Sequence, residues 1–131
     1  MNSVEAKFLS IDGEKRAVAA FQRQDYCTVK DLLVKALKEV QLLGQLPQWV
    51  IDLVDALATI YCMERRYDQA ELLYANTLIA REKILGFNHP DVIDNLQKLA
   101  IIIRERHGDN VATKTIAFRA RYLAIQSPAS I

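Results

Sequence analysis

The stretch from residue 50 to residue 90 reads VIDLVDALATIYCMERRYDQAELLYANTLIAREKILGFNHP, and it decides the fold. Its apolar residues recur at spacings of three and four, which is typical of amphipathic helices. The spacing predicts one helix over about 48–65 and a second from Asp68, where Asp68 and Glu71 match a capping box. Gly86 ends the second segment. The stretch therefore predicts two helices joined by a short turn.

The same pattern recurs on both sides of this stretch. Val50-Ile51-Asp52 returns as Val92-Ile93-Asp94, an offset of 42 residues. Tyr67 has a counterpart in Tyr26, an offset of 41. A fixed period of this size is the signature of stacked helical repeats.

The flanking helices follow from this register. The spacing predicts a helix over 14–23 after a break at Asp12-Gly13, and another that begins near the cap residue Thr28 and ends at Gly44. A fifth helix starts at His89-Pro90, and a sixth runs over about 111–125. No run has the period of a strand, so we expect an all-α fold of six helices in antiparallel pairs. The expected organisation is an N-terminal segment 1–13, a repeat domain 14–126 (repeats roughly 14–47, 48–89 and 90–126) and a C-terminal tail 127–131.

The spacing within each copy resembles the tetratricopeptide repeat, W-x2-L-G-x2-Y, then A-x3-F, then P. The matching residues are Val54, Leu57, Ala58, Tyr61, Ala70, Tyr74 and Pro90. The sequence from Arg65 to Val92 is similar to the kinesin-light-chain type of this repeat. The first copy is weaker, and the last copy departs with Arg119 where the middle copy has Thr77. The resemblance implies a short right-handed solenoid of about three helical hairpins, and the alternative is a plain bundle of such hairpins.

The resemblance also implies a concave face, formed by the first helix of each pair, that binds an extended peptide or a partner helix. The residues expected to face inward are Asp52, Asp55, Thr59, Cys62, Met63, Asp94, Gln97, Ile101, Arg104 and Glu105. Four acids and one arginine give this set a charge of −3. We therefore expect a basic, or mixed basic and apolar, peptide ligand. The alternative is an ordinary solvated helix face.

Composition argues against several other functions. The chain has 131 residues, with 17 Lys plus Arg against 16 Asp plus Glu, so its formal charge of +1 gives no general attraction for nucleic acid or an anionic membrane. Cys27 and Cys62 form no CxxC pair, and His89 and His107 lie outside any metal-ligand spacing. No phosphate-binding loop or nucleophile motif occurs. We expect a cytoplasmic protein without catalytic residues, cofactor or metal.

The C-terminal region has the opposite charge. Arg104, Arg106, Lys114, Arg119 and Arg121 outnumber the acids Glu105 and Asp109. This excess suits phosphates or an acidic partner, or it belongs to a solvated last helix. The apolar residues of that helix, expected to be incompletely covered, are Ile116, Phe118, Tyr122, Leu123 and Ile125. They predict self-association or burial by a larger partner.

Two functions remain in view. The first is a non-catalytic adaptor or scaffold that binds another protein on its concave face. The second is a structural or assembly subunit whose repeat faces are buried in a homo-oligomer or larger complex.

Overall fold

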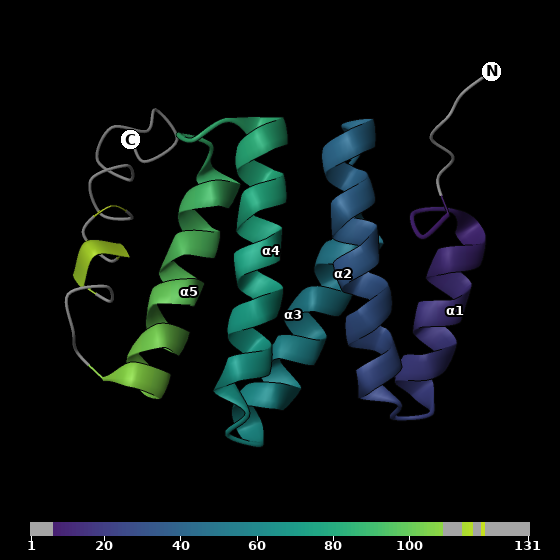
Figure 1. Cartoon of the computed structure of the whole chain (residues 1–131), viewed down its shortest axis with the longest axis horizontal. Helices are drawn as coiled ribbons and strands as arrows, with labels where there is room; N and C mark the ends of the chain where they lie inside the picture. The colour runs from purple at the N-terminus through teal and green to yellow at the C-terminus, as the bar shows by residue number, and fades with distance from the viewer. Residues whose placement is uncertain (1–6, 109–113, 117–118, 120–131) are drawn as a thin grey trace.

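The computed structural model describes residues 7–108, 114–116 and 119. This part of the chain contains five helices: α1 (Ile11–Gln22), α2 (Tyr26–Leu43), α3 (Gln48–Met63), α4 (Tyr67–Leu85) and α5 (Pro90–His107). In Figure 1, α1, α2, α4 and α5 stand side by side, and α3 runs obliquely between α2 and α4. The described residues contain no strand, so the all-α prediction is confirmed. Residues 114–116 and 119 are also helical, and the rest of the predicted sixth helix lies outside the described residues.

The helices pack mainly with close neighbours along the chain. Helix α2 contacts α1, α3 and α4, while α4 contacts α2, α3 and α5. Consecutive helices are joined by short turns, so they alternate in direction (Figure 1). Such packing between neighbouring units is what stacked helical repeats require.

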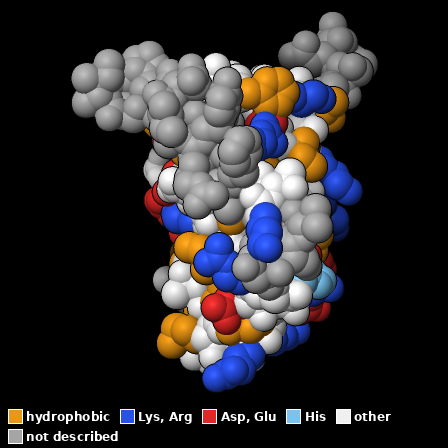
Figure 2. All heavy atoms as spheres, turned by 90° about the vertical axis from the view of Figure 1, so that its left-hand side faces the viewer, with side chains coloured by type: hydrophobic (Ala, Val, Ile, Leu, Met, Phe, Trp, Pro, Cys, Tyr) orange, Lys and Arg blue, Asp and Glu red, His pale blue; other side chains and the backbone are white. Residues whose placement is uncertain are grey.

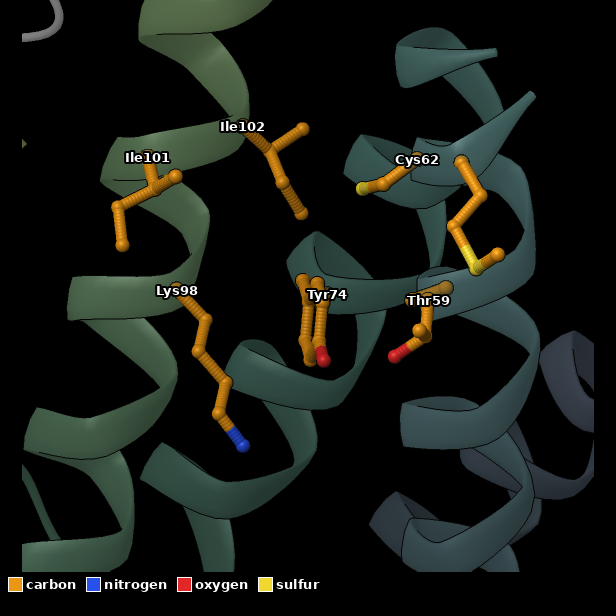
Figure 3. Close-up of a pocket in the computed structure, with 8 residues that line it drawn as sticks. Thr59, Cys62, Tyr74, Lys98, Ile101 and Ile102 are labelled. Atoms are coloured by element: carbon orange, nitrogen blue, oxygen red, sulfur yellow. The ribbon is translucent and has the colours of Figure 1, made fainter. Parts of the chain in front are cut away.

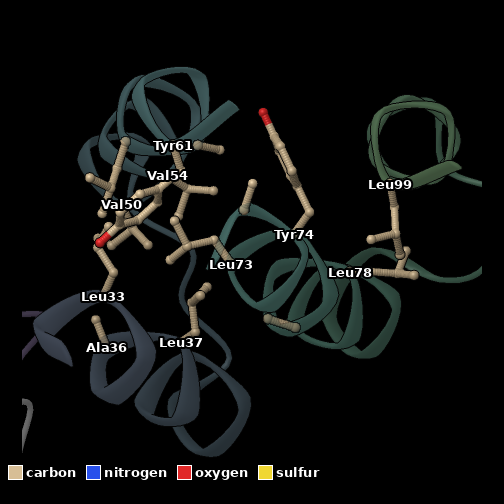
Figure 4. Close-up of a cluster of buried hydrophobic side chains, with 14 of the residues drawn as sticks. Leu33, Ala36, Leu37, Val50, Val54, Tyr61, Leu73, Tyr74, Leu78 and Leu99 are labelled. Carbon is tan, nitrogen blue, oxygen red and sulfur yellow. The ribbon is translucent and has the colours of Figure 1, made fainter. Parts of the chain in front are cut away.

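The core runs between these helices and mixes large residues with alanines. Leu33, Leu37, Val54 and Leu73 are fully buried where α2, α3 and α4 meet (Figure 4). The small side chain of Ala70, which is also fully buried, leaves space for helix backbones to approach closely.

Equivalent positions in the middle and last copies of the sequence pattern share one burial pattern. Val50 and Val92, which are 42 positions apart, are both fully buried. Asp52 and Asp94, at the same offset, are both exposed. The period found in the sequence therefore describes equivalent positions in space.

Three predicted helix ends are confirmed. Gly44 caps α2 with φ of 69°, the left-handed conformation that glycine adopts without strain. Gly86 caps α4, also at positive φ. Pro90 is the first residue of α5, and the Nδ1 atom of His89 accepts a hydrogen bond from the Asp91 N–H at 3.1 Å.

The start of α1 differs from the prediction. The helix begins at Ile11, three residues earlier than expected, and Gly13 lies in its first turn instead of breaking it. Ser10 caps the helix by accepting the Gly13 N–H at 3.2 Å. A Cβ atom at position 13 would lie 2.0 Å from the Phe8 carbonyl oxygen, so glycine is needed here for close approach of the preceding chain.

The starts of α2 and α4 also differ. Asp25, not Thr28, caps α2, and the Thr28 hydroxyl donates to its carboxylate at 2.7 Å. That hydrogen bond lowers the pKa of Asp25. Helix α4 begins at Tyr67 without a side-chain cap. The predicted capping box is absent because the helix starts one residue before Asp68, which places Asp68 inside the first turn and not at the cap position. The Glu71 carboxylate binds Arg106 of α5.

The segment before α1 is held by a carboxylate from α2. The Glu39 side chain accepts the backbone N–H groups of Lys7, Phe8 and Leu9, at distances from 2.9 to 3.2 Å. The Leu9 side chain is buried in the core, and the Lys35 ammonium lies 5.5 Å from the centroid of the Phe8 ring. Residues 7–10 are thus part of the packed structure.

We predict that Glu39→Gln destabilises the protein by about 1–3 kcal/mol, because an amide NH2 group replaces one oxygen that accepts backbone N–H donors. Chemical denaturation measures the change. Asp31→Asn, at an exposed position on the same helix, is the matched control and should change stability by less than about 0.5 kcal/mol. Equal stability of the two variants would contradict the role of Glu39.

Candidate functional site

A groove lies between α3 and α5, and α4 forms its floor (Figure 3). Its cavity volume is about 400 Å³. The residues that line it are Ala58, Thr59, Cys62, Met63, Tyr74, Lys98, Ile101 and Ile102. Most of these side chains are apolar, and among the described lining residues only Lys98 carries a formal charge.

Tyr74 of α4 forms the floor. Tyr74 is buried as a whole, but its hydroxyl points away from the buried apolar side chains of the core (Figure 4). This hydroxyl donates a hydrogen bond to Asp55 Oδ1 of α3 at 2.9 Å. Burial, and then the neighbouring Asp55 carboxylate, raise the pKa of Tyr74, so its hydroxyl stays protonated as a donor.

One end of the groove is polar. The Lys98 ammonium lies 3.5 Å from Asp55 Oδ1 and 3.2 Å from Asp94 Oδ2, and it is 6.0 Å from the centroid of the Tyr74 ring. These contacts join α3, α4 and α5 at a half-exposed cluster. The same cluster holds two of the acids that the sequence assigned to the inner face.

The other parts of the groove are apolar. Met63 and Ile101 stand on opposite walls, and they are 79% and 59% exposed. Ala58 and Ile102, which also line the groove, are buried residues of the core. Large exposed apolar side chains that face one cavity are typical of a surface that contacts another molecule.

Cys62 does not add reactive chemistry to the groove. Burial, and then the negative charge of Glu105, raise the pKa of its thiol. The thiol is therefore protonated at neutral pH and is a poor nucleophile. The described residues include no group of three His, Cys, Asp or Glu side chains that would hold a metal ion.

The tetratricopeptide-repeat family model matches residues 51–91. These residues comprise nearly all of α3, all of α4 and the junction to Pro90. The protein therefore carries a tetratricopeptide repeat. Repeats of this family are generally non-catalytic protein–protein interaction modules. No curated protein matches the chain.

The groove sits between the matched tetratricopeptide repeat and the first helix of the next copy. It brings together four residues predicted from the sequence, namely Thr59, Cys62, Met63 and Ile101. The predicted acids Asp55 and Asp94 meet at Lys98. The remaining predicted residues lie outside the lining: Asp52, Gln97, Arg104 and Glu105, all exposed.

The sequence did not predict that Lys98 and Tyr74 belong to the groove. With Lys98 added to the four acids and Arg104, the charge of the set is −2 instead of −3. The spacing of Asp94 and Lys98, four residues apart on one helix, was the available signal for this ion pair. Tyr74 matches the repeat pattern in the sequence, but nothing in the sequence of its own helix indicates that its hydroxyl reaches α3.

The basic residues after the groove are partly engaged within the chain. The Arg106 guanidinium binds the Glu71 carboxylate, and His107 Nε2 lies 3.6 Å from Glu71 Oε1. Arg119 binds Glu82 at 2.9 Å and lies over the ring of Phe87. Figure 2 shows Lys and Arg side chains spread over the described part of this end.

The predicted apolar surface of the last helix is mostly undescribed. Ile116 is partly buried and packs against the core. Phe118, Tyr122, Leu123 and Ile125 lie outside the described residues, as does Arg121. No helix in the described part of the chain is long and apolar enough to cross a membrane.

We predict that Tyr74→Phe destabilises the protein by about 1 kcal/mol, because the hydrogen bond to half-exposed Asp55 is lost. Tyr61→Phe is the matched control, since its hydroxyl donates to the Tyr26 carbonyl at a longer distance of 3.3 Å. Thermal or chemical denaturation should show the smaller effect for Tyr61→Phe. The reverse order would contradict the assigned role of the Tyr74 hydroxyl.

The raised pKa of Tyr74 also predicts a loss of stability in alkali. The folded state favours the neutral phenol, so its contribution is complete below the ordinary pKa of 10.0. It is lost as the pH rises above that value, because the unfolded chain releases the proton first. Tyr74→Phe should therefore flatten the fall in unfolding free energy above pH 10.0, and an unchanged slope would contradict this.

Proposed function

We propose that this protein is an adaptor that binds a peptide or a partner helix in the groove between α3 and α5. The observation that carries the proposal is the exposure of Met63 and Ile101 on facing walls above the buried floor residue Tyr74. An apolar groove between helices suits an extended or helical segment whose apolar side chains fill it. The repeat family supports a protein partner.

The charges beside the groove favour a basic or mixed basic and apolar ligand. Asp52, Asp55 and Asp94 carry three negative charges, and Lys98 compensates one of them. Complementary charge raises the rate of association and discriminates against acidic partners. We further propose that the protein is cytoplasmic and that its repeats are of the kinesin-light-chain type, as the junction before Pro90 suggests.

A structural subunit is the second candidate, and a different surface favours it. Ile79 and Phe87 are 52% and 62% exposed, and they line a separate cavity with Glu82 and Lys83. These residues lie on α4 and the junction after it, outside the groove. Self-association, or docking on a larger complex, would cover them.

Substitutions on the two surfaces separate these functions. We predict that Ile101→Asp lowers affinity for the natural partner at least about tenfold, because it places an unpaired charge in the apolar wall. Leu72→Asp, at a 41% exposed position of α4 outside the groove lining, is the matched control and should bind normally. Affinity capture from native cells, with quantitative mass spectrometry, measures both.

Phe87→Asp completes the comparison. Partners that are lost with Phe87→Asp and kept with Ile101→Asp would contradict the adaptor proposal and support a subunit. Light scattering of the same variants reports whether the surface at Phe87 joins two copies of the chain.

A further inference from the structure

Lys98 is held at the mouth of the groove by two carboxylates, but neither contact is tight. Its ammonium lies 3.2 Å from Asp94 and 3.5 Å from Asp55, whereas charge-assisted N–H···O bonds are typically about 2.7–2.9 Å. The Lys98 side chain is 40% exposed, and those of Asp55 and Asp94 are 42% and 54% exposed. An ion pair with this exposure contributes little to the stability of the fold, so a ligand cation can replace Lys98 at low cost.

The acids at this end outnumber the cations. Asp52 accepts a hydrogen bond from the neutral Gln48 amide at 2.9 Å, and no ion pair within the described part of the chain compensates its charge. The cluster of Asp52, Asp55, Asp94 and Lys98 therefore carries a net charge of −2. A ligand carboxylate would have to compete with two aspartates for one ammonium in this negative field, whereas a ligand cation would be attracted.

The apolar and acidic parts of the groove are adjacent. Ile101 and Ile102 follow Lys98 by three and four residues on α5, so their Cβ atoms lie about 5–6 Å from that of Lys98. Residues i and i+2 of an extended peptide lie on one face about 7 Å apart. An apolar side chain and a cation separated by one residue therefore match the two parts of the groove.

We propose that Lys98 is an internal stand-in for a cationic side chain of the ligand, which displaces it from Asp55 and Asp94. The occupant is an extended peptide with an apolar residue, then any residue, then Arg or Lys, or the same pattern reversed. Arginine is favoured over lysine because its planar guanidinium donates to two carboxylates at once. This inference rests on the proposed use of the groove for peptide binding.

A display library of short random linear peptides, selected on the full chain, tests the motif. Enriched sequences should contain the apolar residue and the cation with one residue between them. The proposal would be overturned if the enriched peptides carried an acidic residue, or an uncharged one, at the position where the motif has Arg or Lys.

The decisive measurement uses an enriched peptide, made synthetically, and its Arg→Gln counterpart. Lys98→Met keeps the apolar stem and removes the internal competitor, so the arginine peptide should bind about fivefold more tightly than to the wild type. The Gln counterpart should gain nothing. Asp94→Asn should weaken the arginine peptide by a similar factor.

Matched controls separate this effect from net charge and from misfolding. Lys38→Met removes the same charge from an exposed position of α2 and should leave affinity unchanged. Lys98→Gln is a second variant with the same expected gain, in case the methionine variant does not fold by circular dichroism. Unchanged or weaker binding to both Lys98 variants would overturn the proposal.

Ile101→Asp separates two hypotheses, namely that the groove binds peptides and that the peptide displaces Lys98. If it abolishes binding while the Lys98 variants have no effect, the groove binds peptides but the displacement model is wrong. If enriched peptides bind Ile101→Asp as they bind the wild type, or if none is enriched, both the displacement model and the use of the groove fail.

Discussion

Tyr74 connects both walls of the groove to its floor. Its hydroxyl donates to Asp55 on α3, and its backbone carbonyl accepts the side-chain amide of Asn95 on α5 at 2.9 Å. Asn95 is fully buried, so this second bond is protected from water. One residue of α4 thus fixes the positions of the two helices that face each other across the cavity. The separation of Met63 from Ile101, and hence the size of the side chain that fits between them, depends on this pair of bonds.

A buried polar layer fixes the register of α5 behind the groove. The Arg81 guanidinium donates to the Asp91 carbonyl at 3.2 Å and to Asn95 Oδ1 at 3.3 Å. Its Nε atom is buried and has no hydrogen-bond partner among the described residues, which is a cost that an apolar contact would not carry. Apolar side chains alone allow a helix to slide or rotate, whereas these directional bonds select one arrangement. The cost at Arg81 accompanies an alignment of α5 that places Lys98 and Ile101 in the lining of the groove.

The sequence predicted the features that depend on local spacing. Apolar periodicity located the helices, and the short signals at Gly44, Gly86 and Pro90 marked their ends correctly. The errors at the starts of α1 and α2 are local, because Ser10 and Asp25 cap these helices. Two other contacts depend on distant residues and could not be predicted from local spacing. Glu71 matches a capping box in the sequence, but Arg106, 35 residues away, occupies its carboxylate. Lys98 contacts Asp55, a residue of another helix. The sequence therefore predicted the acids of the inner face without the lysine that pairs with them.

The attachment of α1 to the stack has a consequence for local unfolding. This helix packs chiefly on α2, whereas α3 and α4 each pack on at least two neighbours. In a linear stack the free energy of opening is a sum over the interfaces that are broken, so an end held by one interface opens at the lowest cost. Amide hydrogens of α1 therefore exchange with solvent while those of α3 and α4 are still protected. The helices that build the groove keep their arrangement through such fluctuations of the first helix.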